Sequence, residues 1–341
     1  MDTVLQSRIH ASHHTTPVSF RVKSILLLVL VLAADVSANK RYTLPHMVTT
    51  YREDKLIVVE MSYAIPRAGI AASGGNRDNV RIEQTISVVD RLGNSYHSSF
   101  ARPTSLPPAG STSIRRNYLL AHEQIRLPPN EYDLYVGVRD LKVRSTGSFH
   151  SICRAPGEGG RFDISDLQLA TQIISPRDEV ATRQNLVIHP NPLRLYRKGE
   201  RVFVFLELYN LHRDEFGQTQ FEIAYRMARP VEQELQIELF ESLQRNSSYD
   251  EEDSGQSYLV PSKHRQGVRI EKTWEGREGQ TTIATQYVGD ATQDLTYLEF
   301  DIAQLADGIH KLTLIATDLA TKEMATRSVI FRVIEPLPEK H

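Results

Sequence analysis

The alternation of apolar and polar residues along short segments is the feature that most restricts the fold of this chain. In Val80–Val89 (VRIEQTISVV), apolar side chains occupy almost every second position, with charged or hydroxyl side chains between them. A period of two is typical of a half-buried strand. Short apolar or alternating runs also occur at Leu56–Tyr63, Tyr132–Asp140, Val202–Tyr209, Phe221–Met227, Leu235–Phe240, Thr296–Ile302, Lys311–Thr317 and Ser328–Ile334. The sequence shows no long amphipathic helix pattern, so it predicts an all-β fold.

The sequence also contains an internal repeat. Leu127–Leu141 (LPPNEYDLYVGVRDL) aligns without a gap with Leu305–Leu319 (LADGIHKLTLIATDL). Each copy predicts a turn, an alternating strand and an Asp-Leu turn into a last strand. Tyr132 resembles the tyrosine corner of immunoglobulin-like domains, and its counterpart His310 is expected to pack in the same place rather than act as a base.

These patterns predict two tandem immunoglobulin-like β-sandwich domains after an N-terminal signal segment. We place the signal segment at residues 1–38, domain 1 at 39–150, a linker at 151–163 and domain 2 at 164–341. The linker is assigned because Ser151–Asp163 (SICRAPGEGGRFD) contains one proline and three glycines, which interrupt the strand patterns.

The first 38 residues have the order of an export signal. Arg21 and Lys23 precede the ten-residue apolar run Ile25–Ala34, and the small-residue cleavage pattern Val36-Ser37-Ala38 follows. The run is short for a bilayer span. We therefore expect a protein in the periplasm, on the outer surface or secreted; retention at the membrane by an uncleaved N-terminal segment is the alternative. Because the lead before the apolar run is long, we expect translation to start near Val18 or Val22.

Composition and motifs exclude several functional classes. The net charge is −2, from 40 Lys+Arg and 42 Asp+Glu, so nothing attracts nucleic acid or anionic lipid over a long range. Cys153 is the only cysteine, which excludes an intramolecular disulfide and a multi-cysteine zinc site. The sequence has no P-loop, no H-E-x-x-H motif and no G-x-S-x-G elbow. We expect no cofactor.

Glu207 is the candidate for a functional carboxylate. Both faces of Val202–Tyr209 are otherwise apolar, which predicts a central strand that is covered on both sides. A carboxylate there needs a partner or stays protonated. Arg226 or a backbone donor is the expected structural partner. The alternative is a catalytic site in which Glu207 works with Asp163 or Asp166, or is reached by the polar cluster at His189 and Asn191. Within Asp163-Ile-Ser-Asp166, however, the two aspartates look more like turn acids.

An acidic run provides the candidate metal ligands. Calcium binds several oxygen ligands, and Asp250, Glu251, Glu252 and Asp253 are consecutive acids. Their spacing is not that of an EF-hand, and the pattern favours a solvated loop.

A group of motifs resembles the β-rich region of bacterial GWxTD-domain proteins. These motifs are Asp163-Ile-Ser-Asp-Leu-Gln-Leu-Ala170, Pro190-Asn-Pro192 with Tyr196, Leu206-Glu-Leu-Tyr-Asn-Leu211 and Gly217-Gln-Thr-Gln-Phe-Glu-Ile-Ala-Tyr225. The likeness covers roughly residues 161–230. The Gly-Trp-x-Thr-Asp motif itself is absent, and the only tryptophan is Trp274. The resemblance implies export and a bacterial source, and it implies no activity.

Three functions are compatible with these observations. The first is a non-catalytic exported protein that binds a protein or cell-envelope partner through its surface, for instance at exposed sheet edges. The second is carbohydrate binding on tyrosine side chains, for which Tyr63, Tyr96, Tyr118 and Tyr135 are the candidates. The third is a hydrolase that uses Glu207 with a nearby carboxylate.

Overall fold

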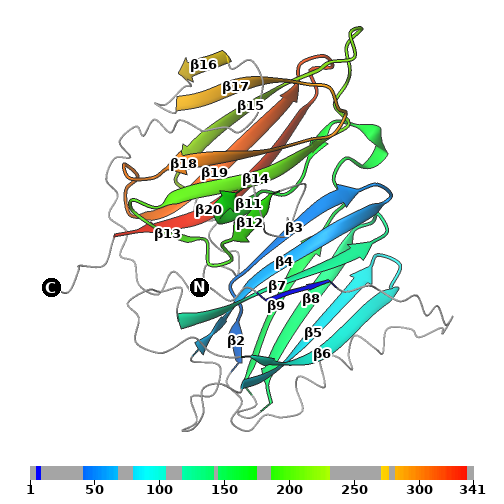
Figure 1. The fold of residues 1–341 in the computed structure, drawn as a ribbon, viewed down its shortest axis with the longest axis vertical. Helices are drawn as coiled ribbons and strands as arrows, with labels where there is room; N and C mark the ends of the chain where they lie inside the picture. Colours follow the sequence, from blue (N-terminus) through cyan, green and yellow to red (C-terminus); the bar gives the residue numbers. More distant parts are fainter. Residues whose placement is uncertain are drawn as a thin grey trace. The chain divides into compact units, whose positions relative to one another are not determined.

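The described part of the chain is built from β-strands. The computed structural model describes residues 5–8, 41–67, 80–104, 117–141, 145–174, 186–230, 270–275 and 281–335 (Figure 1). Within these ranges there is no α-helix, and the strands form four sheets. The all-β prediction is therefore confirmed. The expected strand at Leu235–Phe240 and the signal segment's apolar run lie outside the described residues.

The chain separates into two compact units that are not continuous in sequence. The first unit comprises Met1–Pro45, Tyr63–Arg126 and Glu131–Cys153. The second comprises His46–Ser62, Leu127–Asn130 and Arg154–His341. The segment His46–Ser62, which lies inside the expected range 39–150, thus packs with the C-terminal part of the chain.

One sheet of the first unit has five strands. Its only parallel pair is at the edge, where β2 lies beside β9, and the other neighbours are antiparallel. Its strands in spatial order are β2 (Arg41–Thr43), β9 (Thr146–Cys153), β8 (Tyr132–Asp140), β5 (Val80–Asp90) and β6 (Ser95–Thr104).

A six-stranded sheet of the second unit repeats this arrangement. Again the edge pair, β13 beside β20, is parallel and the other neighbours are antiparallel. Its strands in spatial order are β13 (Leu195–Arg197), β20 (Met324–Ile334), β19 (Gly308–Asp318), β15 (Thr219–Ala228), β17 (Thr281–Gly289) and β16 (Ile270–Glu275).

The repeat seen in the sequence is a repeat in the structure. Tyr132 lies opposite Cys153 and His310 lies opposite Phe331, which are equivalent registers in the two hairpins. The turns that follow the two strands also match. In the first, the Asp140 N–H donates to the Ser145 carbonyl (3.1 Å), and in the second, the Asp318 N–H donates to the Glu323 carbonyl (2.9 Å). Tyr132 and His310 are both buried. His310 stacks on Phe331, and burial lowers its pKa.

The core of the second unit lies between its two sheets. The central strand of the five-stranded sheet is β14 (Arg201–Tyr209). On one side it pairs with β10 (Asp163–Ile164) and β11 (Gln168–Ile174), and on the other side with β18 (Asp294–Asp301). The last strand, β12 (Val187–Pro190), pairs with β11. Val202, Val204, Leu206 and Leu208 of β14 face the six-stranded sheet in one apolar cluster.

The second face of β14 is covered by a hairpin from the N-terminal half. Tyr51 on β3 (His46–Glu53) and Val58 on β4 (Leu56–Pro66) join Phe205 in a separate apolar cluster. The rings of Tyr51 and Phe205 meet edge to face with centroids 5.8 Å apart. The prediction that Val202–Tyr209 is a central strand covered on both sides is thus confirmed. The remaining four-stranded sheet has the order β1 (Leu5–Arg8), β7 (Tyr118–Leu127), β4, β3.

The segment expected to be a linker has regular structure at both ends. Residues 151–153 complete β9, Glu158–Gly160 form a single 3₁₀ turn, and Asp163 begins β10. Gly157, Gly159 and Gly160 have positive φ, which explains the glycines of this segment.

The parallel edge pair of the first unit is expected to require glycine at position 147. A Cβ there would lie 2.4 Å from Cε2 of Tyr42 and 2.8 Å from Cδ2 of Leu44. We predict that Gly147→Ala lowers the free energy of unfolding by about 1–3 kcal/mol in urea denaturation, because the overpacked side chains must shift. Gly137→Ala in the neighbouring strand is the matched control, since its Cβ would meet only Thr85 Cβ at 3.9 Å. Equal stability of the two variants would contradict the prediction.

Candidate functional site

Glu207 is sealed inside the second unit. Its exposed fraction is 0%. Its Oε2 accepts a hydrogen bond from the Tyr209 hydroxyl (2.7 Å) and one from the Gln293 side-chain amide (3.3 Å). Tyr209 lies two positions further along β14 and therefore on the same face of the strand. These hydrogen bonds satisfy the buried carboxylate within the fold.

The hydrogen bonds of Glu207 continue to the β3 strand. The Tyr209 hydroxyl accepts the backbone N–H of Arg52 (3.0 Å), and the Gln293 amide also lies 3.5 Å from the Arg52 carbonyl oxygen. Arg52, Tyr209, Glu207 and Gln293 thus form a closed ring of polar contacts. This ring joins the end of β3 to β14 and to the segment that precedes β18.

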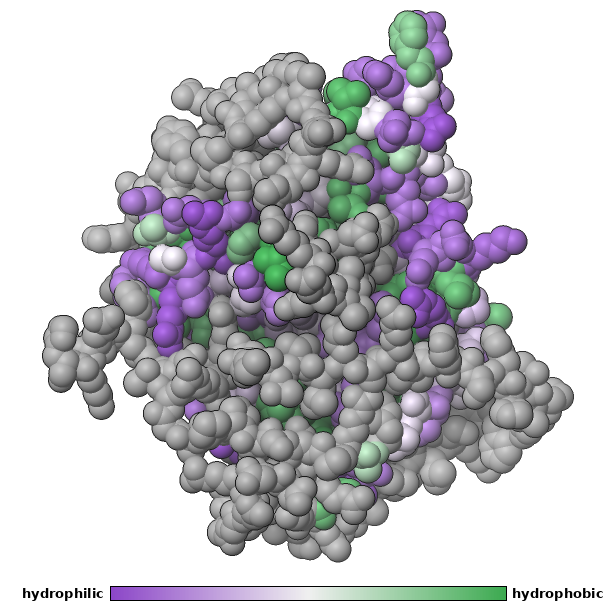
Figure 2. Space-filling view, in the orientation of Figure 1, coloured by the Kyte–Doolittle hydropathy of each residue, from purple (hydrophilic) through white to green (hydrophobic). Residues whose placement is uncertain are grey.

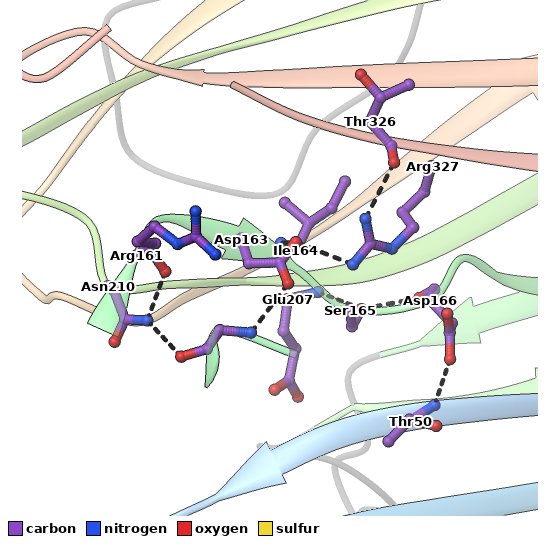
Figure 3. A network of polar contacts seen from close by, with 11 residues as sticks. Thr50, Arg161, Asp163, Ile164, Ser165, Asp166, Glu207, Asn210, Thr326 and Arg327 are labelled. Atoms are coloured by element: carbon purple, nitrogen blue, oxygen red, sulfur yellow. Dashed lines mark hydrogen bonds and ion pairs between the residues drawn. The ribbon is translucent and has the colours of Figure 1, made fainter. Parts of the chain in front are cut away.

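The backbone of Glu207 is held as firmly as its side chain. Its N–H donates to Ser165 Oγ (3.0 Å), and its carbonyl accepts the Ser165 N–H (2.9 Å). Ser165 Oγ in turn donates to the Asp166 carbonyl (2.8 Å). Figure 3 shows Ser165 beside Glu207, with Asp163 and Asp166 directed to different partners.

Asp163 organises the turn before β10. Its Oδ2 accepts the Gly157 N–H (3.0 Å), and its Oδ1 accepts from the Ile164 N–H (2.8 Å) and from the Arg327 guanidinium (2.9 Å) (Figure 3). Asn210, at φ 58°, closes the same turn by donating to the Gly157 carbonyl (2.9 Å) and the Arg161 carbonyl (2.7 Å). All of these contacts fix the chain, as expected for a turn acid.

Asp166 connects the same region to β3. Its Oδ2 accepts the Thr50 N–H (2.9 Å). Burial raises the pKa of Asp166, and this effect exceeds the opposing effects of the Thr50 hydrogen bonds and of the Arg327 charge. The carboxylate is therefore held in the fold at a cost in desolvation.

A third buried carboxylate was missed from the sequence. Glu60 on β4 accepts from the Gln168 amide (3.0 Å), and Gln168 accepts from the Tyr51 hydroxyl (2.9 Å). Both Glu60 and Gln168 are buried. The signal was present, since Glu60 is the one acid inside the apolar run Leu56–Tyr63.

The other residues proposed to act with Glu207 have different roles. Arg226 is exposed on β15, whereas the partners of Glu207 are a tyrosine and an amide. Asn191 is buried and shapes a turn: its side chain donates to the Leu195 carbonyl (3.0 Å) and its N–H to the Leu169 carbonyl (2.9 Å). His189 is half-buried on β12.

The four candidate tyrosines have different environments. Tyr63 is buried and accepts from the Gln84 amide (2.6 Å). Tyr96 and Tyr118 are half-buried, and Tyr96 meets Tyr132 edge to face. Tyr135 is 41% exposed and stacks on His150 with centroids 4.6 Å apart, while His150 Nε2 lies 2.8 Å from Asp133 Oδ1. The structure does not bring the four tyrosines into one site.

The candidate calcium ligands Asp250, Glu251, Glu252 and Asp253 lie outside the described residues. Within the described ranges, no group of three or more His, Cys, Asp or Glu side chains is placed to hold a metal ion. Cys153 is buried at the end of β9. In that same part of the chain, no helix has the length and apolar character to cross a bilayer.

Comparisons with known proteins give no family. No family model matches the chain. Two protein translocase subunits SecA of Prochlorococcus marinus match at 24% identity over 222 residues and 25% over 210 residues. The matches cover 64% and 61% of this chain, and the chain spans 22% of each SecA. The resemblance to GWxTD-domain proteins therefore stays a prediction.

Two solved structures are similar at low TM-scores. The structure described as Escherichia coli alpha-2-macroglobulin activated by porcine elastase has a TM-score of 0.23 at 10% identity; the match covers 88% of this chain and 22% of that one. The structure named BspA_C_WT has a TM-score of 0.21 at 8% identity, with 86% and 96% of the two chains covered. Scores of this size carry no argument about function.

The ring around Glu207 is expected to be structural. We predict that Tyr209→Phe lowers the free energy of unfolding by about 2–4 kcal/mol, because it leaves a buried carboxylate oxygen and the Arg52 N–H without the tyrosine hydroxyl. Urea denaturation measures the change. Tyr135→Phe is the control, and we expect it to stay within about 0.5 kcal/mol of the parent because Tyr135 is exposed. A Tyr209→Phe protein as stable as the control would refute the structural role.

Asp166 is expected to make stability depend on pH. Because its folded-state pKa lies above the unfolded value, the folded chain binds this proton more tightly. Its contribution to stability therefore rises as pH falls through the folded pKa and is lost as pH increases. We predict that Asp166→Asn is at least as stable as the parent near pH 7, and that this difference shrinks near pH 5. Thermal unfolding at both pH values measures it, with Asp290→Asn as an exposed control. A large loss of stability in Asp166→Asn near pH 7 would contradict the prediction.

Proposed function

We propose that this chain is an exported, non-catalytic protein of two tandem immunoglobulin-like β-sandwich domains that binds a protein partner of the cell envelope through its surface. The export signal in residues 1–38 supports the location. The repeated strand order β2-β9-β8-β5-β6 and β13-β20-β19-β15-β17 supports a duplicated sandwich. The apolar cluster between the two sheets of the second unit supports the same architecture.

The hydrogen bonding of the candidate carboxylates supports a non-catalytic role. Glu207, Asp163, Asp166 and Glu60 all accept hydrogen bonds from groups that also define the fold. A catalytic acid or nucleophile needs to reach its substrate, and Glu207 has no exposed surface. These side chains therefore support a role in holding β3 and β10 against β14.

The observation that carries the proposal is the construction of two surface turns. In the first unit, Asp90 Oδ1 accepts the N–H groups of Leu92 (2.9 Å) and Asn94 (2.8 Å), and the Asp90 carbonyl accepts the Gly93 N–H (3.0 Å). Gly93 has φ 85°, which an L side chain rarely adopts. The turn is thus fixed by its own backbone, and it leaves Leu92 84% exposed.

The hairpin between β14 and β15 has the same turn. Asp214 Oδ1 accepts the N–H groups of Phe216 and Gln218 (both 2.9 Å), and the Asp214 carbonyl accepts the Gly217 N–H (3.0 Å). Phe216 is 80% exposed. On the face drawn in Figure 2, an apolar residue stands among hydrophilic ones at the tip of this protruding hairpin.

A rigid turn that exposes one large apolar side chain is suited to a pocket in a partner protein. Aromatic and leucine side chains contribute binding energy when they fill such pockets, and little conformational entropy is lost because the turn is already ordered. The Phe216 tip also has Asp214 and Glu215, and the Leu92 tip has Asp90 beside Arg91. Neither tip has the excess of Lys and Arg that attracts an anionic membrane surface. A protein is therefore the favoured partner.

Loss of the exposed side chains is expected to abolish partner binding without unfolding the protein. Photo-crosslinking in envelope extract first identifies the partner, and its affinity is then measured for Leu92→Ser and Phe216→Ser. We predict that at least one variant binds about tenfold more weakly or worse, because a buried anchor contributes at least about 1.4 kcal/mol. Met324→Ser is the matched control, since Met324 is 70% exposed but lies outside these turns.

Two results would contradict the proposal. Unchanged affinity in both serine variants would remove the turns from the interface. Binding of the parent chain to lipid vesicles that is lost in Phe216→Ser would identify a membrane instead of a protein. Thermal unfolding of each variant verifies that the fold is intact.

A further inference from the structure

Arg194 is held in an uncommon backbone conformation. It lies between the turn at Pro192-Leu193 and β13, and its φ is 50°. The Arg194 N–H donates to the Asn191 carbonyl (3.0 Å), and its own carbonyl accepts the Arg332 N–H (2.8 Å). A non-glycine residue in the left-handed region is strained, and such strain concentrates at binding sites. Because both backbone groups are bonded, the position from which the side chain projects is fixed.

The guanidinium of Arg194 has no ion pair among the described residues. Its Nε is enclosed and has no hydrogen-bond partner. Burial lowers the pKa of Arg194 to about 10, which still leaves the side chain cationic at neutral pH. The residue as a whole is half-buried. By contrast, the half-buried Arg327 is paired with Asp163 at 2.9 Å.

The strands around Arg194 have no acid to neutralise it. The four strands nearest in the fold, β11, β12, β13 and β20, contain no Asp or Glu in their sequences QLATQII, VIHP, LYR and MATRSVIFRVI. The segment from His189 to Gly199 also contains no acid. Its Lys198 is neutralised by Asp307 (3.0 Å) and Glu335, which leaves these two acids engaged away from Arg194. The strands around Arg194 therefore supply no carboxylate for its guanidinium.

The nearest titratable neighbour does not replace an anion. Tyr196 is fully buried, and its hydroxyl donates to the Ala170 carbonyl (3.0 Å). A neutral tyrosine engaged in that way supplies no negative charge to the guanidinium. A buried, unpaired charge is strongly unfavourable, and it is satisfied when a ligand brings the opposite charge.

We propose that Arg194 is the centre of a binding site for an oxyanion, namely the phosphate or carboxylate group of a small ligand. The planar guanidinium has five N–H donors in a fork that matches these groups. The four neighbouring strands contain no Asp or Glu that would compete with such a ligand for these donors. This site is independent of the turns that carry Leu92 and Phe216.

The first test uses the full chain with inorganic phosphate as the probe. Thermal unfolding is followed in phosphate and in chloride at equal ionic strength, and phosphate binding is measured by calorimetry. We expect phosphate to raise the Tm of the parent chain by roughly a few degrees at saturation. We expect Arg194→Met to lose this shift and to bind phosphate at least about tenfold more weakly. Arg226→Met, at an exposed arginine, is expected to behave as the parent. Acetate in place of phosphate distinguishes the two oxyanion classes.

The second test is the stability of the variants without a ligand. If the guanidinium is unpaired in the free protein, Arg194→Met in chloride is at least as stable as the parent, because a buried charge has been removed. Failure of Arg194→Met to fold, or a clear drop in its Tm, would show that the chain itself pairs Arg194 and would overturn the proposal. An equal phosphate shift in the parent and in Arg194→Met would also overturn it, as an effect of salt on the whole protein.

Discussion

The burial of β14 on both faces is the constraint on which the second unit depends. A strand with two apolar faces needs two covers, and the six-stranded sheet supplies only one of them. The other cover is the β3–β4 hairpin, which precedes β14 by about 150 residues in the sequence. The polar groups at this second face are then satisfied by Glu207, Asp166 and Glu60, each of which accepts a hydrogen bond that fixes the hairpin or the strand beside it. Burial of these carboxylates makes the arrangement specific, because an unpaired donor or acceptor there is costly.

Charged side chains in the described part of the second unit differ in how they are paired. Glu207, Asp163 and Asp166 have partners that belong to the fold, and their donors are backbone N–H groups, a tyrosine, an amide and Arg327. Arg194 has a backbone fixed by two hydrogen bonds but a side-chain Nε without a hydrogen-bond partner. The same physical rule, that a buried polar group must be paired, explains the carboxylates as structure and indicates a ligand for Arg194. The proposed turns and the proposed oxyanion site both lie at residues other than Glu207, the carboxylate to which the sequence draws attention.

Duplication accounts for much of the remaining architecture. The hairpins that contain Tyr132 and His310 keep the same register and the same turn although tyrosine and histidine differ in chemistry. Both residues place a buried ring near the start of a strand. The turns at Asp90 and Asp214 are alike for a different reason: an aspartate that accepts two N–H groups and a glycine with positive φ are sufficient to close a tight hairpin. Neither requirement involves Leu92 or Phe216, which are therefore free to serve an interface.

The sequence by itself determined the strand periodicity, the internal repeat and the central position of Val202–Tyr209, because these depend on local alternation of side chains along one strand. It also identified Asp163 as a turn acid from its neighbours. Only the tertiary structure decided which partners the buried groups have: Tyr209 and Gln293 for Glu207, the β3 strand for Asp166, and no acid for Arg194. These partners come from segments distant in sequence, and no periodicity encodes which segment covers a given face. The assignment of His46–Ser62 to the second unit has the same origin, since a hairpin packs where it buries the most apolar surface and pairs its polar groups.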